Sequence, residues 1–186
     1  MKNIFTQSVM TKSLLAVSLA ALLPVSAMAA ETSGGTVNFS GSVVTSACAI
    51  GSDSANIDVD LGQVRTATLA AAGSEASTAK AFSIVLEDCD TTVSKAVAVT
   101  FSGTPDANDA TSLAAGSNGG TGSAQNVAIR LYDEQGTVVK LGEPAGAVTL
   151  RDGENTLNFS AKYYSPKGTA TAGDASAVAT YTMTYS

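Results

Sequence analysis

The chain contains no histidine and only two cysteines among its 186 residues. The missing histidine removes the commonest general base and the usual serine and cysteine triads, and it excludes most zinc and copper sites. Three pairs of carboxylates remain, at Asp58 and Asp60, Asp88 and Asp90, and Asp106 and Asp109. Alternate aspartates on a strand are ordinarily solvated, and aspartates in turns bind their own backbone. We therefore predict no catalytic residue, no metal and no cofactor, and a protein that is not an enzyme.

The sequence also lacks a surplus of positive charge and a long apolar run. Ten Lys and Arg residues stand against sixteen Asp and Glu residues, so the formal net charge is −6 at pH 7. This balance opposes binding to nucleic acid or anionic lipid, because both need clustered basic residues. The most apolar stretch, residues 14–23, is about half the length needed to span a bilayer, so we predict no membrane insertion.

The first 29 residues have the pattern of an export signal. Lys2 and Lys12 precede and border the apolar stretch, and Ala27-Met28-Ala29 fits the small-residue cleavage site. A single-span anchor is the alternative, which the short apolar stretch disfavours. Cleavage after Ala29 leaves 157 residues (186 − 29) and a net charge of −8 (−6 − 2), a size typical of one domain.

Export places the two cysteines, Cys48 and Cys89, where thiols oxidise. Two cysteines can pair in only one way, so we expect one disulfide, with two unpaired thiols as the alternative. Closing a loop of about 40 residues would stabilise the fold by roughly 4 kcal/mol on the chain-entropy model.

Alternation with a period of two residues dominates the exported part and predicts β-strands. The alternating apolar sets are Ile57/Val59/Leu61, Phe82/Ile84/Leu86, Val97/Val99/Phe101, Val127/Ile129/Leu131, Leu157/Phe159/Ala161/Tyr163 and Ala177/Ala179/Tyr181/Met183/Tyr185, with shorter candidates at residues 138–141 and 147–150. Residues 66–79 are compatible with a loop or a short helix. Many short strands with Gly-rich turns predict an all-β antiparallel sandwich. The absence of tryptophan excludes an antibody domain proper.

The start of the exported part carries the most informative pattern. Gly35, Val37, Phe39, Gly41 and Val43 share one face of a predicted strand. Glycine weakens a strand interior and marks a close approach by another backbone or a shallow pocket. An ordinary first strand with small residues at a crowded position is the other interpretation.

Several separated motifs together resemble the chaperone–usher pilins, in particular the major subunits of type 1 fimbriae. They are the run Gly-Gly-Thr-Val-Asn-Phe-Ser-Gly-Ser-Val-Val at residues 34–44, Cys48, Leu61-Gly62-Gln63-Val64, Asp88-Cys89-Asp90, Gly173 as the fourteenth residue from the end, and the penultimate Tyr185. The resemblance covers essentially the whole exported part and is weaker in residues 102–123.

This resemblance implies an incomplete immunoglobulin-like β-sandwich that lacks its final strand, which a neighbouring subunit supplies. Residues 1–29 would be the signal peptide, 30–44 the donor-strand extension and 45–186 the pilin domain. The donor residues would be Gly35, Val37, Phe39, Gly41 and Val43, with Val37, Phe39 and Val43 inserting and the two glycines lying where the groove is shallow. The acceptor groove and chaperone edge would comprise Gly173, Ala179, Tyr181, Met183 and Tyr185.

The implied partners are identical subunits in a homopolymer, a periplasmic chaperone that fills the groove, and an outer-membrane usher that exchanges it. The chain would pass through the periplasm to a cell-surface fimbrium used in adhesion. A minor pilin, an adaptor or an adhesive subunit of the same pilus class is the alternative.

Overall fold

The computed structural model describes residues 34–116 and 122–186, so the predicted signal peptide lies outside the described residues. The described residues fall into two units, residues 34–41 and the described part of residues 42–186. In the first unit, the described residues 34–41 form no helix or strand. The second unit holds all the described strands and two short 3₁₀ helices, η1 (Ser52–Ser54) and η2 (Thr66–Leu69).

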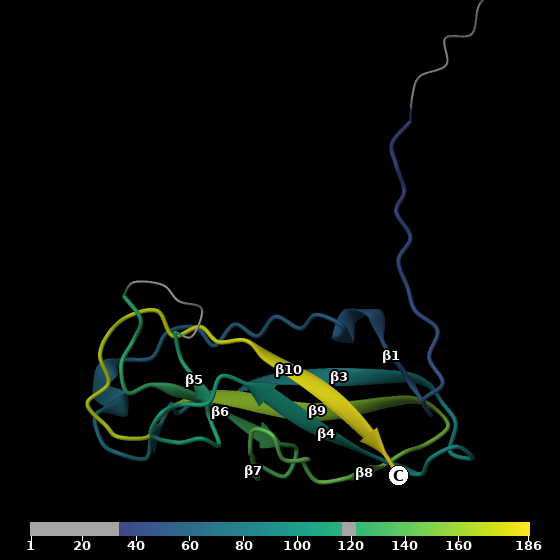
Figure 1. Ribbon diagram of the computed structural model, residues 1–186. Coiled ribbons are helices and arrows are strands. Elements are labelled where there is room, and N and C mark those ends of the chain that lie inside the picture. Colours follow the sequence, from purple (N-terminus) through teal and green to yellow (C-terminus); the bar gives the residue numbers. More distant parts are fainter. Residues whose placement is uncertain (1–33, 117–121) are drawn as a thin grey trace, which may run out of the picture. The chain divides into compact units, whose positions relative to one another are not determined.

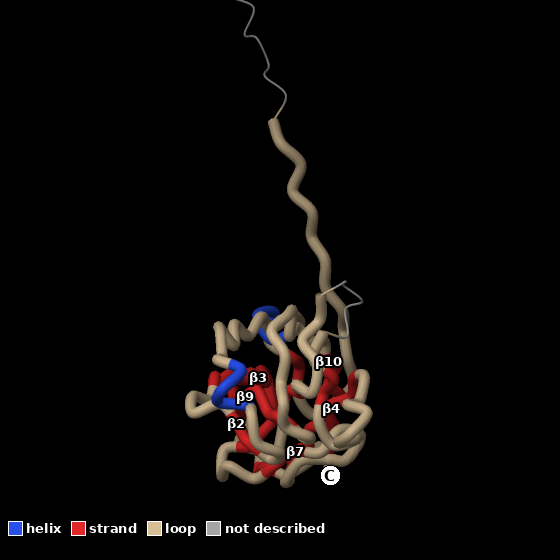
Figure 2. Tube along the Cα trace, turned by 90° about the vertical axis from the view of Figure 1, so that its left-hand side faces the viewer, coloured by secondary structure: helices blue, strands red, loops and turns tan. Residues whose placement is uncertain are grey.

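Two antiparallel sheets form the second unit, and Figures 1 and 2 show them as two layers. Among the described residues, the larger sheet has the order β1 (Ala49–Ile50), β3 (Lys80–Cys89), β9 (Gly153–Ser165), β6 (Ala128–Asp133) and β5 (Leu113–Ala114), with β2 (Ser74–Glu75) on β9 and β7 (Val138–Val139) on β6. The smaller sheet has the order β10 (Ala179–Tyr185), β4 (Ala96–Gly103) and β8 (Val148–Thr149).

The core lies between the sheets because each long strand turns alternate apolar residues inward. Ile84 and Leu86 of β3 meet Val97 and Val99 of β4 in one buried cluster. Three phenylalanines, Phe82, Phe101 and Phe159, pack with ring centroids 5.0 to 6.1 Å apart. This architecture confirms the predicted all-β sandwich.

The predicted disulfide is present and joins Cys48 to Cys89, 41 residues apart. It connects the segment before β1 to the end of β3, and the Asp90 N–H donates to the Ala47 carbonyl beside it at 2.9 Å. The bridge therefore fixes the point at which the N-terminal segment enters the sandwich.

Several predicted elements differ from those observed. Residues 57–61 keep the predicted alternation, with Asp58 and Asp60 exposed, but they form no strand because they pair with no neighbour in the described residues. Residues 35–43 also form no strand. The undecided stretch 66–79 contains η2 and β2, while the two-residue strands β1 and β5 were not predicted.

Candidate functional site

The last strand, β10, has a hydrogen-bonding partner on one side only. It pairs antiparallel with β4 from Ala179 opposite Gly103 to Tyr185 opposite Val97. Among the described residues no strand lies on its other side. An open strand edge is a template for another strand, and natural proteins usually cover such an edge.

The inward face of β10 is also incompletely buried. Its partners on β4, Val97, Val99 and Phe101, expose at most 3% of their surface. By contrast, the β10 residues that face the same core remain half-buried, namely Tyr181, Met183 and Tyr185. β4 lies between β10 and β8, whereas β10 is at the edge of its sheet, so the difference shows that among the described residues no side chains cover the inward face of β10 from beyond its free edge.

A groove of about 1100 Å³ occupies this space. Its side along β10 is formed by Ala177, Ala179, Tyr181, Met183 and Tyr185. Its floor is formed by core residues of both sheets, namely Phe82, Phe101, Leu113, Ile129, Leu131 and Ala161. The groove is thus a long apolar slot that opens onto the core along an unpaired strand edge.

The opposite wall is the extended segment 55–61, whose residues Ile57, Val59 and Leu61 line the groove. Among the described residues, 56–64 make no backbone-to-backbone hydrogen bond. Unpaired backbone groups that become buried must find partners. An occupant of the groove can therefore form backbone hydrogen bonds on both of its sides.

Tyr181 links β10 to η1, which directly precedes the opposite wall. Its hydroxyl donates to the Ser54 carbonyl at 2.5 Å, and the Ser54 hydroxyl in turn accepts from the Val85 N–H at 2.8 Å. Burial raises the pKa of Tyr181, with a further contribution from Tyr185, whose own pKa is raised by burial. Both phenols are therefore neutral at physiological pH and can act as apolar lining.

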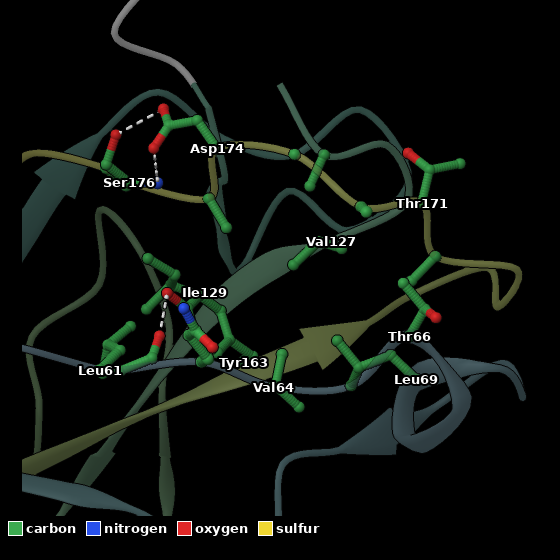
Figure 3. A pocket seen from close by; sticks show the side chains of 18 of the residues that line it. Leu61, Val64, Thr66, Leu69, Val127, Ile129, Tyr163, Thr171, Asp174 and Ser176 are labelled. Atoms are coloured by element: carbon green, nitrogen blue, oxygen red, sulfur yellow. Dashed lines mark hydrogen bonds between the residues drawn. The ribbon is translucent and has the colours of Figure 1, made fainter. Parts of the chain in front are cut away.

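A second cavity of about 560 Å³ continues the groove beyond the start of β10 (Figure 3). Val59, Leu61, Ile129 and Ala177 line both cavities. The second cavity is otherwise lined by residues that include Val64, Leu69, Val127 and Tyr163, and the Tyr163 hydroxyl donates to the Gly62 carbonyl at 3.4 Å. The two cavities together are lined by β10 and by residues 170–177, which precede it.

Gly173 lies at this second cavity and not along β10. A Cβ at this position would overlap the Gly122 carbonyl and the Ala124 amide, so the glycine permits close backbone packing. This packing is reinforced because the Ala124 N–H donates to the Asp174 carbonyl at 2.8 Å and the Asp174 N–H donates to the Gly122 carbonyl at 2.9 Å.

The predicted donor residues lie in an exposed segment. Val37 and Phe39 expose 72% and 93% of their surface, and Val43 is fully exposed. Beside Gly35 and Gly41 there is open space where a Cβ would stand. Three large apolar side chains in such an exposed segment are unusual, since Phe and Val are among the residues most often buried.

The structure thus brings Ala179, Tyr181, Met183 and Tyr185 together along one groove, and it places Gly173 at the adjoining cavity. Sequence reasoning missed the floor residues Leu113 and Ile129 as parts of the site. It also took residues 57–61 for a strand, although their alternation correctly marks which side chains face the groove. The described part of the chain has no group of three or more His, Cys, Asp or Glu side chains placed to hold a metal ion.

Comparisons with known proteins agree on one family. The family described as "Fimbrial protein" matches residues 37–186. The type-1 fimbrial protein A chain of Escherichia coli K12 is 40% identical, and the similarity covers 94% of this chain and 97% of the relative. The major MR/P fimbria protein of Proteus mirabilis is 42% identical, with 86% and 89% covered.

Solved structures lead to the same group of proteins. The P pilus rod subunit PapA has a TM-score of 0.64 at 31% identity, covering 76% of this chain and all of that one. A chaperone–usher pilus, whose structure is described as revealing the molecular basis of rod uncoiling, has a TM-score of 0.71 at 32% identity, with 86% and 100% covered.

Proposed function

This chain belongs to the fimbrial protein family, and we propose that it is the main rod subunit of a chaperone–usher fimbria, in which residues 34–44 of one copy fill the groove of the next. The observation that carries the proposal is the half-buried inward face of β10 beside a free strand edge. The similarity to the major MR/P fimbria protein and to the P pilus rod subunit PapA supports the assignment as a rod subunit.

A β-strand is the occupant that suits the groove. Free backbone groups on β10 and on residues 56–61 favour an extended guest that bonds on both edges. The apolar floor favours a guest with one apolar face, as in residues 35–43. Strand addition of this kind supplies affinity through the main chain and specificity through alternate side chains, and chaperone–pilin complementation is itself a known instance.

The direction of the guest follows from where the chain leaves its own sandwich. Ser42, Val44 and Ser46 line the groove close to the Cys48–Cys89 bridge. This is also the end at which β10 finishes, because Tyr185 pairs with Val97 at the start of β4. A guest parallel to β10 would bring its own domain to this occupied end. An antiparallel guest brings its domain to the opposite end, beside the second cavity.

One antiparallel register matches all five apolar-face positions of the guest. The groove side along β10 has five inward positions at alternate residues from Ala177 to Tyr185, and the guest has five from Gly35 to Val43. Full overlap places Val43 opposite Ala177 and Phe39 opposite Tyr181, with Gly35 opposite Tyr185. Val43 then faces the second cavity, and the guest extends beyond β10 just as the combined cavities do.

The energy of this contact is sufficient for assembly. Burial of three large apolar guest side chains at roughly 1.5 to 3 kcal/mol each contributes about 5 to 9 kcal/mol before ladder hydrogen bonds are counted. The donor segment and the groove are different surfaces, so the contact is head-to-tail and can propagate into an open filament.

The same groove explains the expected partners. An apolar slot with a free strand edge favours aggregation, so a subunit awaiting assembly needs a protein that covers it. We propose that a periplasmic chaperone fills this role and that an outer-membrane usher directs the exchange for a second copy. The assembled filament stands on the cell surface. No helix in the described part of the chain is long and apolar enough to cross a membrane.

A direct test moves the guest onto the same chain. Residues 30–44 are deleted, and residues 34–44 are attached after Ser186 through a short flexible linker. Because β10 ends where an antiparallel guest begins, a linker of about 2 to 5 residues suffices. We expect a monomer with a higher unfolding midpoint than the deletion alone.

The matched control carries the same graft with Phe39→Ser, which should lose most of the gain in unfolding midpoint. An intact graft that gives no more stability than the deletion would contradict the proposed occupancy. Normal filaments formed by the deletion variant would contradict the role of residues 30–44 as donor.

A further inference from the structure

One wall of the second cavity is a segment that belongs to neither sheet. Residues 170–177 all line this cavity, and Figure 3 shows Asp174 and Ser176 on the side opposite Val64 and Leu69. None of residues 170–177 is part of a strand, because β10 begins two residues later. The shape of the cavity therefore depends on the contacts that hold this segment, which we call the cavity wall.

The turn before the cavity wall contains a residue in a conformation that is rare for its type. Thr169 has a φ of 52°, in the left-handed region, and Gly168 before it has a φ of 80°. Glycine adopts this region freely, but a β-branched residue there is an outlier because its Cβ crowds the backbone. The Thr169 side chain is exposed, so its own packing does not impose the conformation.

Hydrogen bonds from two other segments hold Thr169. Its N–H donates to the Ala70 carbonyl, directly after η2, at 2.9 Å. The Asn126 side-chain amide donates to the Thr169 carbonyl at 3.3 Å and to its hydroxyl at 3.4 Å. Asn126 also has a positive φ of 56°, which asparagine tolerates better than most residues. The left-handed turn is thus fixed against two neighbouring segments.

A buried serine connects these contacts to the start of the cavity wall. The fully buried Ser165 hydroxyl donates to the Asn126 carbonyl at 2.8 Å and accepts from the Gly168 N–H at 3.0 Å. Two residues into the wall, the Thr171 N–H donates to the Gln125 carbonyl at 3.1 Å, and the Gln125 N–H donates to the Thr171 hydroxyl at 2.9 Å. An ordinary negative φ at position 169 would turn the following chain in another direction and break this pair.

We infer that Thr169 is a positioning residue for the end of the incoming segment, because its left-handed backbone holds the cavity wall against which Val43 of the neighbouring copy packs. The inference rests on the proposed function, whose register places Val43 opposite Ala177 and facing the second cavity. Thr169 is not among the residues that line the cavity, so it acts through the wall. Backbone strain kept beside a binding site is a known means of pre-organising it.

The test compares two synthetic peptides of residues 34–44 by the concentration that halves filament growth of the full chain. One peptide has the natural sequence and the other carries Val43→Ala. On the unaltered chain, the second peptide should be weaker by roughly 5- to 50-fold, because it lacks two methyl groups that pack in the cavity. This ratio reports on the second cavity, since the two peptides are otherwise identical.

Two substitutions of Thr169 should give opposite results. Thr169→Gly removes the whole side chain but adopts the left-handed region freely, so the ratio should stay at roughly 5- to 50-fold. Thr169→Val keeps the branched shape, but it loses the contact with Asn126 and the hydroxyl bond to the Gly168 carbonyl at 2.7 Å. The wall should then relax, and the ratio should fall below about threefold. A role for the side chain itself predicts the reverse order.

Asp88→Gly is the matched control. Asp88 is a further residue with a positive φ, of 50°, and it lines neither cavity. On that chain the ratio should equal that of the unaltered chain. If Thr169→Val prevents folding, Asn126→Gly removes the amide bonds to Thr169 while position 126 keeps an allowed backbone, and the ratio should fall by at least about twofold.

The outcomes separate this inference from the proposed function. A natural peptide that fails to stop growth of the unaltered chain would contradict the proposed function itself. If both peptides act alike on the unaltered chain, strand exchange stands, but Val43 does not pack in the second cavity and this inference is wrong. It is equally wrong if the Thr169→Val and Thr169→Gly chains give the same ratio.

Discussion

Replacement of Phe39 by alanine should weaken the contact between subunits while leaving each subunit as stable as before. Phe39 exposes 93% of its surface in the free chain. A phenylalanine side chain offers about 150 to 250 Å² for burial. Burial at roughly 25 cal/mol per Å², together with the cavity that the alanine would leave in the groove, makes the loss cost about 3 to 5 kcal/mol of assembly free energy.

That cost corresponds to a weakening between about 100-fold and a few thousandfold. It can be measured as the shift in the guanidinium concentration at which filaments release subunits, followed by sedimentation and electron microscopy. Ser40→Ala is the matched control, because Ser40 lies on the other face of the same segment and should change the midpoint very little.

Two results would refute the reasoning. Filaments of the Phe39→Ala chain that dissociate at the same midpoint as the original would show that Phe39 is not buried in the contact. A fall in the unfolding midpoint of the isolated subunit would show that Phe39 packs against its own domain.

Three further substitutions test the supporting structure. Asp109→Asn should lower the unfolding free energy at neutral pH by about 1 to 3 kcal/mol. Burial raises the pKa of Asp109, but hydrogen bonding to the charged form outweighs burial and lowers the pKa. The stabilisation that Asp109 provides is therefore present above pH about 4 and is lost on acidification. Denaturation measured from pH 7 to 2 should show a smaller loss of unfolding free energy for the variant than for the original chain, and an identical slope would contradict this. Gly173→Ala should destabilise the subunit by about 1 to 3 kcal/mol, because its Cβ would overlap the Gly122 carbonyl; an unchanged thermal midpoint would disprove the packing role. Tyr181→Phe should cost about 1 kcal/mol in urea denaturation through loss of the hydrogen bond to Ser54, and no change would mean that water replaces this partner.

Alternation alone predicted the sandwich and its inward side chains, because a strand with one buried face must repeat every two residues. It predicted β4 and β10 well, since both keep an apolar face along their whole length. It failed at residues 57–61 because alternation reports which side chains are buried and cannot report whether the backbone has a partner. The pattern there belongs to one wall of an unfilled groove.

The short strands were harder to predict. β1 and β5 are two residues long, too short for any periodicity to be visible. β5 nevertheless positions Leu113 in the groove floor. The close approach of Leu113 to Gly103 could not be inferred from the sequence, because it joins two sheets and depends on how they are packed. That the groove is shallow opposite the two glycines at 35 and 41 stays a prediction.

The most direct test of strand exchange is a map of the assembled filament by electron cryomicroscopy at a resolution that identifies side chains. We expect residues 35–43 of one subunit to run antiparallel to β10 of the next, with Phe39 beside Tyr181 and Val43 in the second cavity. A map in which each subunit fills its own groove, or in which the groove along β10 stays empty, would contradict the account.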